Sequence, residues 1–265
     1  MMKKIFLTSA LLIPVLLSAQ TKEFIVEAGA QRTLIGTERT LSLKTLSLGD
    51  NATIIIPPGM DGWTVTATDA SIGNNVRIIG LGVNGTYGIS GASAGSTFSC
   101  SVGFAGINGT NGTYGTPGKN VSLNLKIRTI GTLTISVNGG NGGNGGNGGS
   151  GGKGGNATCT CNAGNGGKGG NGGNGGIGGS GGNVNITYSK IGNIAVSSSN
   201  FIIQNRGGLG GFGGAFGAGG QGGEGGGCTD PKALIKPAGS PGWNGAHGTN
   251  VITTARNGAT TIKTM

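Results

Sequence analysis

The sequence contains few of the side chains on which catalysis and metal binding depend. His247 is the only histidine, Asp and Glu together number eight, and there are four cysteines among 265 residues. No HExxH motif or P-loop occurs. The GxSxG and Gly-x-Gly matches in the glycine-rich regions lack the strand–turn–helix or βαβ context that these motifs require. We therefore expect neither an enzyme, nor a bound cofactor, nor a metal site.

Proline and aromatic residues are also scarce. Seven prolines are too few for collagen, although glycine occupies 64 positions. Aromatic residues make up 5% of the chain and are not interleaved with the basic ones, so no nucleic-acid-binding motif is present. Beyond the N-terminus no apolar run is long enough to span a bilayer. We predict no nucleic-acid partner and no membrane span.

Residues 1–19 have the features of a secretory signal peptide. Lys3 and Lys4 form a basic start, an apolar stretch follows, and Ser18 and Ala19 precede Gln20. Removal of the two lysines lowers the formal net charge from +10 to +8. The sequence predicts a protein that is secreted or held at the surface or in the periplasm of a bacterium. Its basic charge favours anionic partners such as an acidic glycan, with solubility as an equally good explanation.

Residues 20–81 form an N-terminal β region. Short stretches rich in β-branched residues alternate or run apolar between Gly, Pro, Asn and Asp turn signals, which predicts a short-strand sheet or a β-solenoid. Trp63 is expected in its core, and no amphipathic helix is expected after the signal peptide. The predicted strands lie at 24–27, 40–47, 52–56, 63–68 and 76–79, with further strand-like stretches at 121–137, 184–204 and 251–263.

Glycine recurs with a period of three in the rest of the chain. From 139 to 183 a non-glycine residue, mostly Asn, Ser or Lys, stands at every third position, interrupted only at 157–163. Similar triplets begin at 82 and at 207. This period fits neither an α-helix nor a strand, but it fits a polyproline-II-type helix with three residues per turn. Glycine-rich sequence without such phase would be a flexible linker or disorder.

We therefore predict a mainly-β fold with added polyglycine-II structure. Residues 82–265 would form three repeats in which a triplet helix runs out, a tip turns, and a second helix returns. The tips lie near 93–102, 157–163 and 228–237. The β base would carry the three polyglycine-II hairpins packed as a bundle, because glycine lets neighbouring backbones approach closely. The Asn, Ser and Lys column of the second hairpin is expected to face solvent, and Leu209 and Phe212 to pack on the β core.

The four cysteines fall only at the three tips. An even number in an exported chain favours disulfides. Because Cys159 and Cys161 are two positions apart, we expect one to reach Cys100 and the other Cys228, without assigning which. A Cys-x-Cys metal site is the rival interpretation, but this spacing fits no zinc signature. Cross-linked tips would restrain an array in which glycine is costly to order.

The Gly-Gly-x and Gly-x-x triplets between about 82 and 248 resemble the polyglycine-II helical sandwich of the adhesins that tip the long tail fibres of T-even-type phages. They are similar also to the glycine-rich, disulfide-bonded antifreeze proteins of springtails. In the phage family the loops at the end of the bundle bind the host receptor. The resemblance implies binding residues in the tips here: Thr97, Phe98, Thr158, Thr160, Asn162, Thr229, Asp230 and Lys232.

These patterns favour an exported, non-enzymatic, adhesin-like surface protein. Its disulfide-tied tips would bind a glycan or another cell-surface molecule. One alternative is a structural subunit of an extracellular matrix or filament, in which the chains self-associate through their glycine faces. Another is an ice-binding protein that uses the regular Asn and Ser column of the central hairpin.

Overall fold

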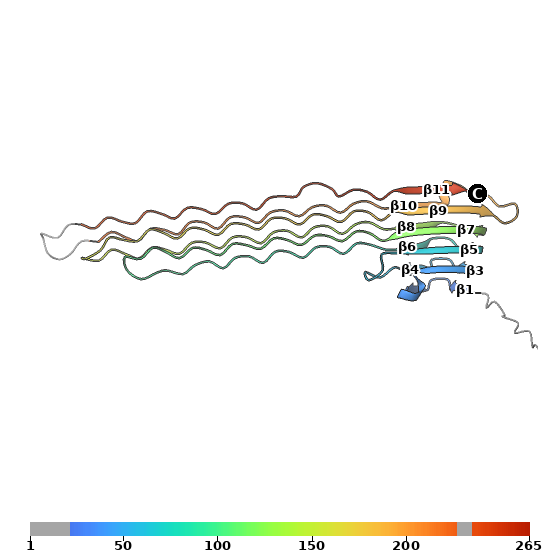
Figure 1. Cartoon of the computed structure of the whole chain (residues 1–265), viewed down its shortest axis with the longest axis horizontal. Helices are drawn as coiled ribbons and strands as arrows, with labels where there is room; N and C mark the ends of the chain where they lie inside the picture. The colour runs from blue at the N-terminus through green and yellow to red at the C-terminus, as the bar shows by residue number, and fades with distance from the viewer. Residues whose placement is uncertain (1–21, 227–234) are drawn as a thin grey trace, which may run out of the picture.

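The computed structural model describes residues 22–226 and 235–265. The predicted signal peptide lies outside the described residues, as do Cys228, Thr229, Asp230 and Lys232. The described chain is elongated, with two β-sheets at one end and long glycine-rich segments running away from them side by side (Figure 1).

Two parallel sheets form the β end of the molecule. The first has six strands in the order β1 (Glu23–Val26), β3 (Thr40–Leu48), β5 (Gly62–Ile72), β7 (Asn120–Ile130), β9 (Val184–Lys190) and β11 (Thr260–Thr264). The second has five, in the order β10 (Phe201–Gln204), β8 (Leu133–Ser136), β6 (Val76–Ile79), β4 (Thr53–Ile55) and β2 (Gln31–Thr33). Consecutive strands therefore alternate between the sheets. Two short 3₁₀ turns, Gly36–Glu38 and Ser198–Asn200, complete the regular structure.

The hydrophobic core lies between the two sheets. In β5 the side chains alternate, so that Trp63, Val65 and Ala67 are buried while Thr64 and Thr66 are exposed. Period-two alternation places one face of each strand inward. Trp63 is in the core, as predicted, with its ring 5.8 Å from that of Phe24. Full burial of side chains of this kind stabilises the fold by about 1.5–3 kcal/mol each.

Six glycine-rich segments continue the strands. We call them segments 1 to 6, and together the glycine array: residues 82–92, 103–118, 139–156, 164–183, 207–226 and 239–258. Segments 1, 3 and 5 follow β6, β8 and β10, and form the odd layer. Segments 2, 4 and 6 lead into β7, β9 and β11, and form the even layer. The two layers of sheet thus continue as two layers of glycine-rich backbone (Figure 1).

Backbone hydrogen bonds join the segments in a regular register. Within a layer neighbours are parallel: Gly85 N donates to Asn141 O at 2.7 Å, and three residues on Gly88 N donates to Asn144 O at 2.7 Å. Between layers they are antiparallel, as where Gly143 N donates to Thr113 O at 2.9 Å. These bonds need backbones in close contact, which glycine permits because it has no Cβ.

The predicted fold class, three polyglycine-II hairpins packed as a bundle on a β base, was wrong. The regular structure of the described residues consists of the two parallel sheets and two 3₁₀ turns, and no polyglycine-II bundle is shown. The fold is mainly β. The sequence period of three was interpreted as the turn of a helix. In the structure it is the spacing of the glycine amides that bond to neighbouring segments, and that spacing does not establish a helix type.

Candidate functional site

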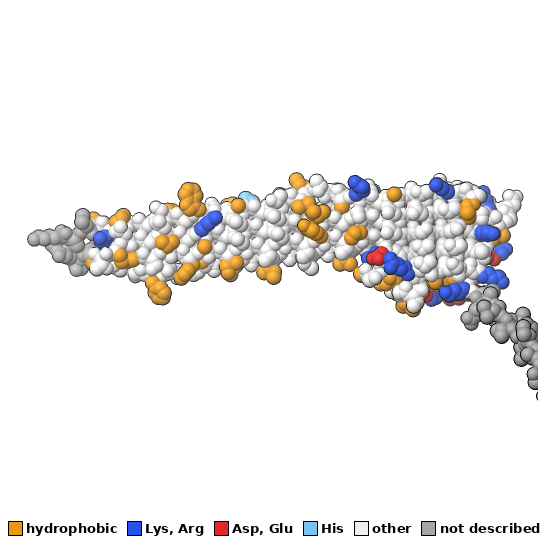
Figure 2. Space-filling view, in the orientation of Figure 1, with side chains coloured by type: hydrophobic (Ala, Val, Ile, Leu, Met, Phe, Trp, Pro, Cys, Tyr) orange, Lys and Arg blue, Asp and Glu red, His pale blue; other side chains and the backbone are white. Residues whose placement is uncertain are grey.

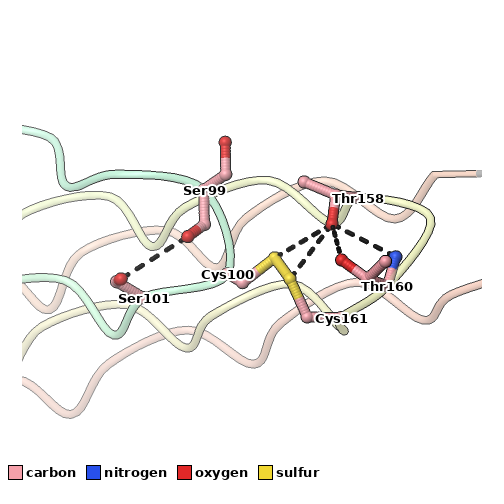
Figure 3. The surroundings of a disulfide bond; sticks show 6 residues. All are labelled: Ser99, Cys100, Ser101, Thr158, Thr160 and Cys161. Carbon is pink, nitrogen blue, oxygen red and sulfur yellow. Dashed lines mark hydrogen bonds between the residues drawn. A yellow bond between two sulfur atoms is a disulfide. The ribbon is translucent and has the colours of Figure 1, made fainter.

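Two turns of the array are joined by a disulfide at the end far from the sheets (Figures 1 and 3). Residues 93–102 connect segments 1 and 2, and residues 157–163 connect segments 3 and 4. The bond links Cys100 to Cys161, with their Cα atoms 5.9 Å apart. This is one of the pairings that the sequence left open. Cys159 is disulfide-bonded as well.

The Thr158 hydroxyl lies at the centre of this tip (Figure 3). Its Oγ1 is 3.1 Å from Cys161 Sγ, 3.1 Å from Thr160 Oγ1 and 3.5 Å from Cys100 Sγ. Thr158 N also donates to Cys161 O at 3.1 Å, which closes the turn. Thr158 therefore contacts three other predicted residues of the tips, which are Cys100, Thr160 and Cys161.

Cys100 reaches the disulfide through an unusual backbone conformation. Its φ is +64°, in the left-handed region that a non-glycine residue rarely adopts. Cys100 N donates to Asn156 O at 3.0 Å, and Ser101 N donates to Phe98 O at 3.2 Å. These bonds hold the turn and leave the Phe98 ring 86% exposed beside it. Thr97 is half-buried, and Asn162 is exposed.

The two turns joined by the disulfide, residues 93–102 and 157–163, carry no charged side chain. The nearest ion pair joins Lys153 of segment 3 to Glu224 of segment 5, with Nζ 2.6 Å from Oε1. The hydrogen bond and charge of Lys153 lower the pKa of the Glu224 carboxyl. Lys and Arg side chains gather instead around the sheets at the opposite end (Figure 2). The tip therefore offers hydroxyl groups and one aromatic ring to a partner.

Asparagine has a structural role that the sequence reasoning missed. The predicted solvent-facing column includes exposed residues such as Asn141 and Asn147, yet their side-chain oxygens are engaged. Each Oδ1 accepts a hydrogen bond from a backbone N–H of the next parallel segment in the same layer, at 2.7–2.9 Å. The pairs of this asparagine ladder include Asn84 with Asn141, Asn141 with Leu209, Asn144 with Phe212, Asn147 with Ala215, Asn108 with Asn171, Asn171 with Ala246 and Asn174 with Thr249.

The contribution of the asparagine ladder to stability can be tested at Asn147. Changing Asn147→Ala removes the acceptor for Ala215 N and should lower the free energy of unfolding by about 1 kcal/mol. Asn147→Asp keeps an acceptor oxygen in the same place and should cost less. Urea denaturation of both variants measures the difference. Equal stability of the two would show that the side-chain oxygen does not contribute.

Side chains also accept hydrogen bonds from some backbone amides of segments 1 and 5, the outer segments of the odd layer. At one edge the hydroxyls of Thr110, Thr113 and Thr116 accept from the amides of Ile89, Thr86 and Val83, each at 2.7 Å. At the other edge the side chains of Asn244, Asn250 and Asn257 accept from Gly219, Gly213 and Gly207. These contacts satisfy a part of the backbone donors that an added chain could otherwise use.

The single histidine also belongs to an edge. Phe216 replaces an expected glycine, and its ring meets that of His247 edge-to-face with centroids 4.6 Å apart. Within residues 22–226 and 235–265, no three His, Cys, Asp or Glu side chains lie close enough together to hold a metal ion. None of the helices in that part of the chain has the length and apolar character of a membrane span.

No protein-family model and no curated protein matches the chain. Among solved structures it is similar to the nine polyproline type II helical bundle antifreeze protein of the springtail Granisotoma rainieri. The identity is 25% over 63% of this chain and 93% of that one, with a TM-score of 0.11. A likeness at that TM-score carries no argument. The resemblance to springtail antifreeze proteins is therefore supported only by this weak structural match, and the resemblance to phage tail-fibre adhesins is not supported.

Proposed function

We propose that this chain is an exported, non-enzymatic binding protein of the bacterial surface. The glycine array holds a disulfide-tied tip away from the β-sheets, where the tip contacts a molecule on a cell surface. The observation that carries the proposal is the Cys100–Cys161 bond, which fixes two turns at the far end of the array beside an exposed Phe98.

The array is suited to holding such a tip in place. Its segments are bonded to one another along their length, and the asparagine ladder adds side-chain bonds within each layer. The side-chain caps on segments 1 and 5 reduce the number of backbone donors available for edge-to-edge pairing, which favours a single chain over the filament alternative. The engaged Asn oxygens likewise favour a structural role over an ice-binding one.

The chemistry of the tip favours a partner rich in hydroxyl groups, such as a glycan. Thr158 and Thr160 supply hydroxyls, and both residues are exposed. The Phe98 ring supplies an apolar surface against which the C–H face of a sugar can pack. The disulfide-joined turns at 93–102 and 157–163 provide no charge for an acidic group, whereas many Lys and Arg side chains lie at the sheet end of the molecule (Figure 2).

Substitution of Phe98 tests this function. The labelled, exported protein is titrated onto intact bacterial cells and onto purified cell-wall polysaccharide. Phe98→Ser should weaken binding about tenfold or more without changing the melting temperature, since the ring is almost fully exposed. Tyr114→Ser, an exposed aromatic position on the flank of the array, is the matched control and should bind normally. Binding that is absent, or that ignores Phe98, would contradict the proposal.

A further inference from the structure

A second candidate surface lies on the outward face of the odd layer, away from the tip. The parallel register sets residues of segments 1, 3 and 5 in rows across this face. Asn84, Asn141 and Leu209 form one row, joined by side chain-to-backbone bonds of 2.8 and 2.9 Å. Tyr87, Asn144 and Phe212 form the next, because Gly88 N donates to Asn144 O and Phe212 N to Asn144 Oδ1. The two rows line a groove of about 230 Å³, which we call the flank groove.

Aromatic and aliphatic side chains make the walls of the flank groove. Tyr87 stands on segment 1 with 76% of its surface exposed. Phe212 and Leu209 stand on segment 5 and are 59% and 57% exposed. The sequence placed these last two on the β core, and the structure instead leaves them in solvent. Gly85, Gly142 and Gly210 also line the groove, and their lack of side chains keeps the space between the walls open.

Asparagine amides supply the polar groups of the groove. The Oδ1 atoms of Asn84, Asn141 and Asn144 each accept from a backbone N–H of the next segment, which fixes the planes of the three amides. Each amide still has an Nδ2 group with two N–H donors. None of these Nδ2 groups donates a hydrogen bond to another described residue. No charged side chain lines the groove.

We propose that the flank groove binds a neutral oligosaccharide. A sugar ring has an apolar C–H face, which would pack on Tyr87 and Phe212, and hydroxyl oxygens, which would accept from Asn141 and Asn144 Nδ2. Fixed polar groups between apolar walls are the usual composition of a small-molecule site. The lack of charge in the lining selects against acidic sugars. This site is separate from the tip and goes beyond the function proposed for it.

The other face of the array provides an internal comparison. Level with the flank groove along the array, Thr113 and Gly176 of the even layer are hydrogen-bonded to Gly143 of the odd layer. The residues that follow them, Tyr114 and Ile177, are exposed on the other face. Ile177 stands where the odd layer has Asn144. That face has an aromatic ring but no amide donor beside it in this row, so it should not bind the same ligand.

Isothermal titration of the full exported chain tests the proposal, with cellohexaose and maltohexaose as neutral probes and hexagalacturonate as the acidic one. At least one neutral probe should bind. Tyr87→Ala and Phe212→Ala should each lower its affinity about tenfold or more. Asn144→Asp keeps the oxygen that accepts from Phe212 N but removes the amide donor, and should lower the affinity without loss of stability. Tyr114→Ala should have no effect.

Several results would overturn it. These are no heat with either neutral probe, binding of hexagalacturonate alone, or neutral binding that survives Tyr87→Ala and Phe212→Ala. A second copy of the chain is the other possible occupant of the groove, and sedimentation velocity tests for it. Self-association that Tyr87→Ala abolishes would show that the groove binds a second copy and not an oligosaccharide. Binding to cells is tested with Phe98→Ser, and binding of the neutral probe with Tyr87→Ala and Phe212→Ala against Tyr114→Ala, so failure at the tip and failure at the groove can be told apart.

Discussion

Gly146→Ala should lower the free energy of unfolding by about 3 kcal/mol or more. Gly146 is buried in segment 3, its N–H donates to Thr110 O at 2.9 Å, and its carbonyl accepts from Gly173 N at 2.8 Å. A Cβ added here would overlap the carbonyl group of Ile89 and come within 2.8 Å of Ser90 N. These neighbours are backbone atoms and no flexible side chain can move aside, so the segments themselves must separate.

Urea denaturation and amide hydrogen exchange measure this effect. Exchange should accelerate at Gly85, Gly88 and Gly91, because their hydrogen bonds to segment 3 weaken when segments 1 and 3 part. Gly95→Ala is the matched control, since a Cβ there meets no heavy atom within 4 Å. It should change stability by no more than about 0.5–1 kcal/mol. A Gly146→Ala protein as stable as the control would mean that segments 1 and 3 are farther apart than the structure shows.

Loss of the tip disulfide should have an effect of similar size. The double variant Cys100→Ser/Cys161→Ser opens a loop in which the two residues are 61 positions apart. The chain-entropy model gives about 4 kcal/mol for a loop of this length, and a shift of this size in a chain of this length lowers the melting temperature by roughly 10 °C. Replacing both cysteines avoids a free thiol that could exchange with the disulfide at Cys159.

Thr158→Val serves as the control for that variant. It removes the hydroxyl that lies 3.1 Å from Cys161 Sγ while the disulfide remains, so it should cost only about 1 kcal/mol. Scanning calorimetry compares the melting temperatures of the two variants. Amide hydrogen exchange at positions 100 and 157 shows whether the tip opens. If the double variant and Thr158→Val have the same melting temperature, the disulfide holds the two turns together without contributing to global stability.

The two ends of the molecule are stabilised differently. The sheets enclose a core of apolar side chains such as Trp63, Leu125 and Ile135. The array has no such core: its interior is glycine backbone, and each hydrogen bond there contributes about 1 kcal/mol net. Substitutions that add volume should therefore be most damaging in the array, whereas substitutions that remove volume should be most damaging between the sheets.

Local pattern was enough to locate much of the β structure. Period-two alternation placed strands near β1, β3, β5 and β6 and put Trp63 in the core, because a strand that buries one face must alternate. It missed β2 (Gln31–Thr33), which has no apolar alternation to reveal it. Clustering of the cysteines in the tips indicated that Cys100 would pair with one of two partners, since 159 and 161 are too close to pair well with each other.

The sequence by itself determined where backbones can approach one another, through glycine every third residue, and where most of the strands and the cysteine-bearing turns occur. Only the tertiary structure decided which segments are neighbours and in what register. The separation of 57 residues between Asn84 and Asn141, and of 68 between Asn144 and Phe212, depends on the strands and turns in between. That register turns the asparagines into a ladder, leaves Leu209 and Phe212 in solvent, and brings Tyr87 into the same row as Phe212. A period of three is common to every segment, so it could not specify this choice or the conformation that the segments adopt.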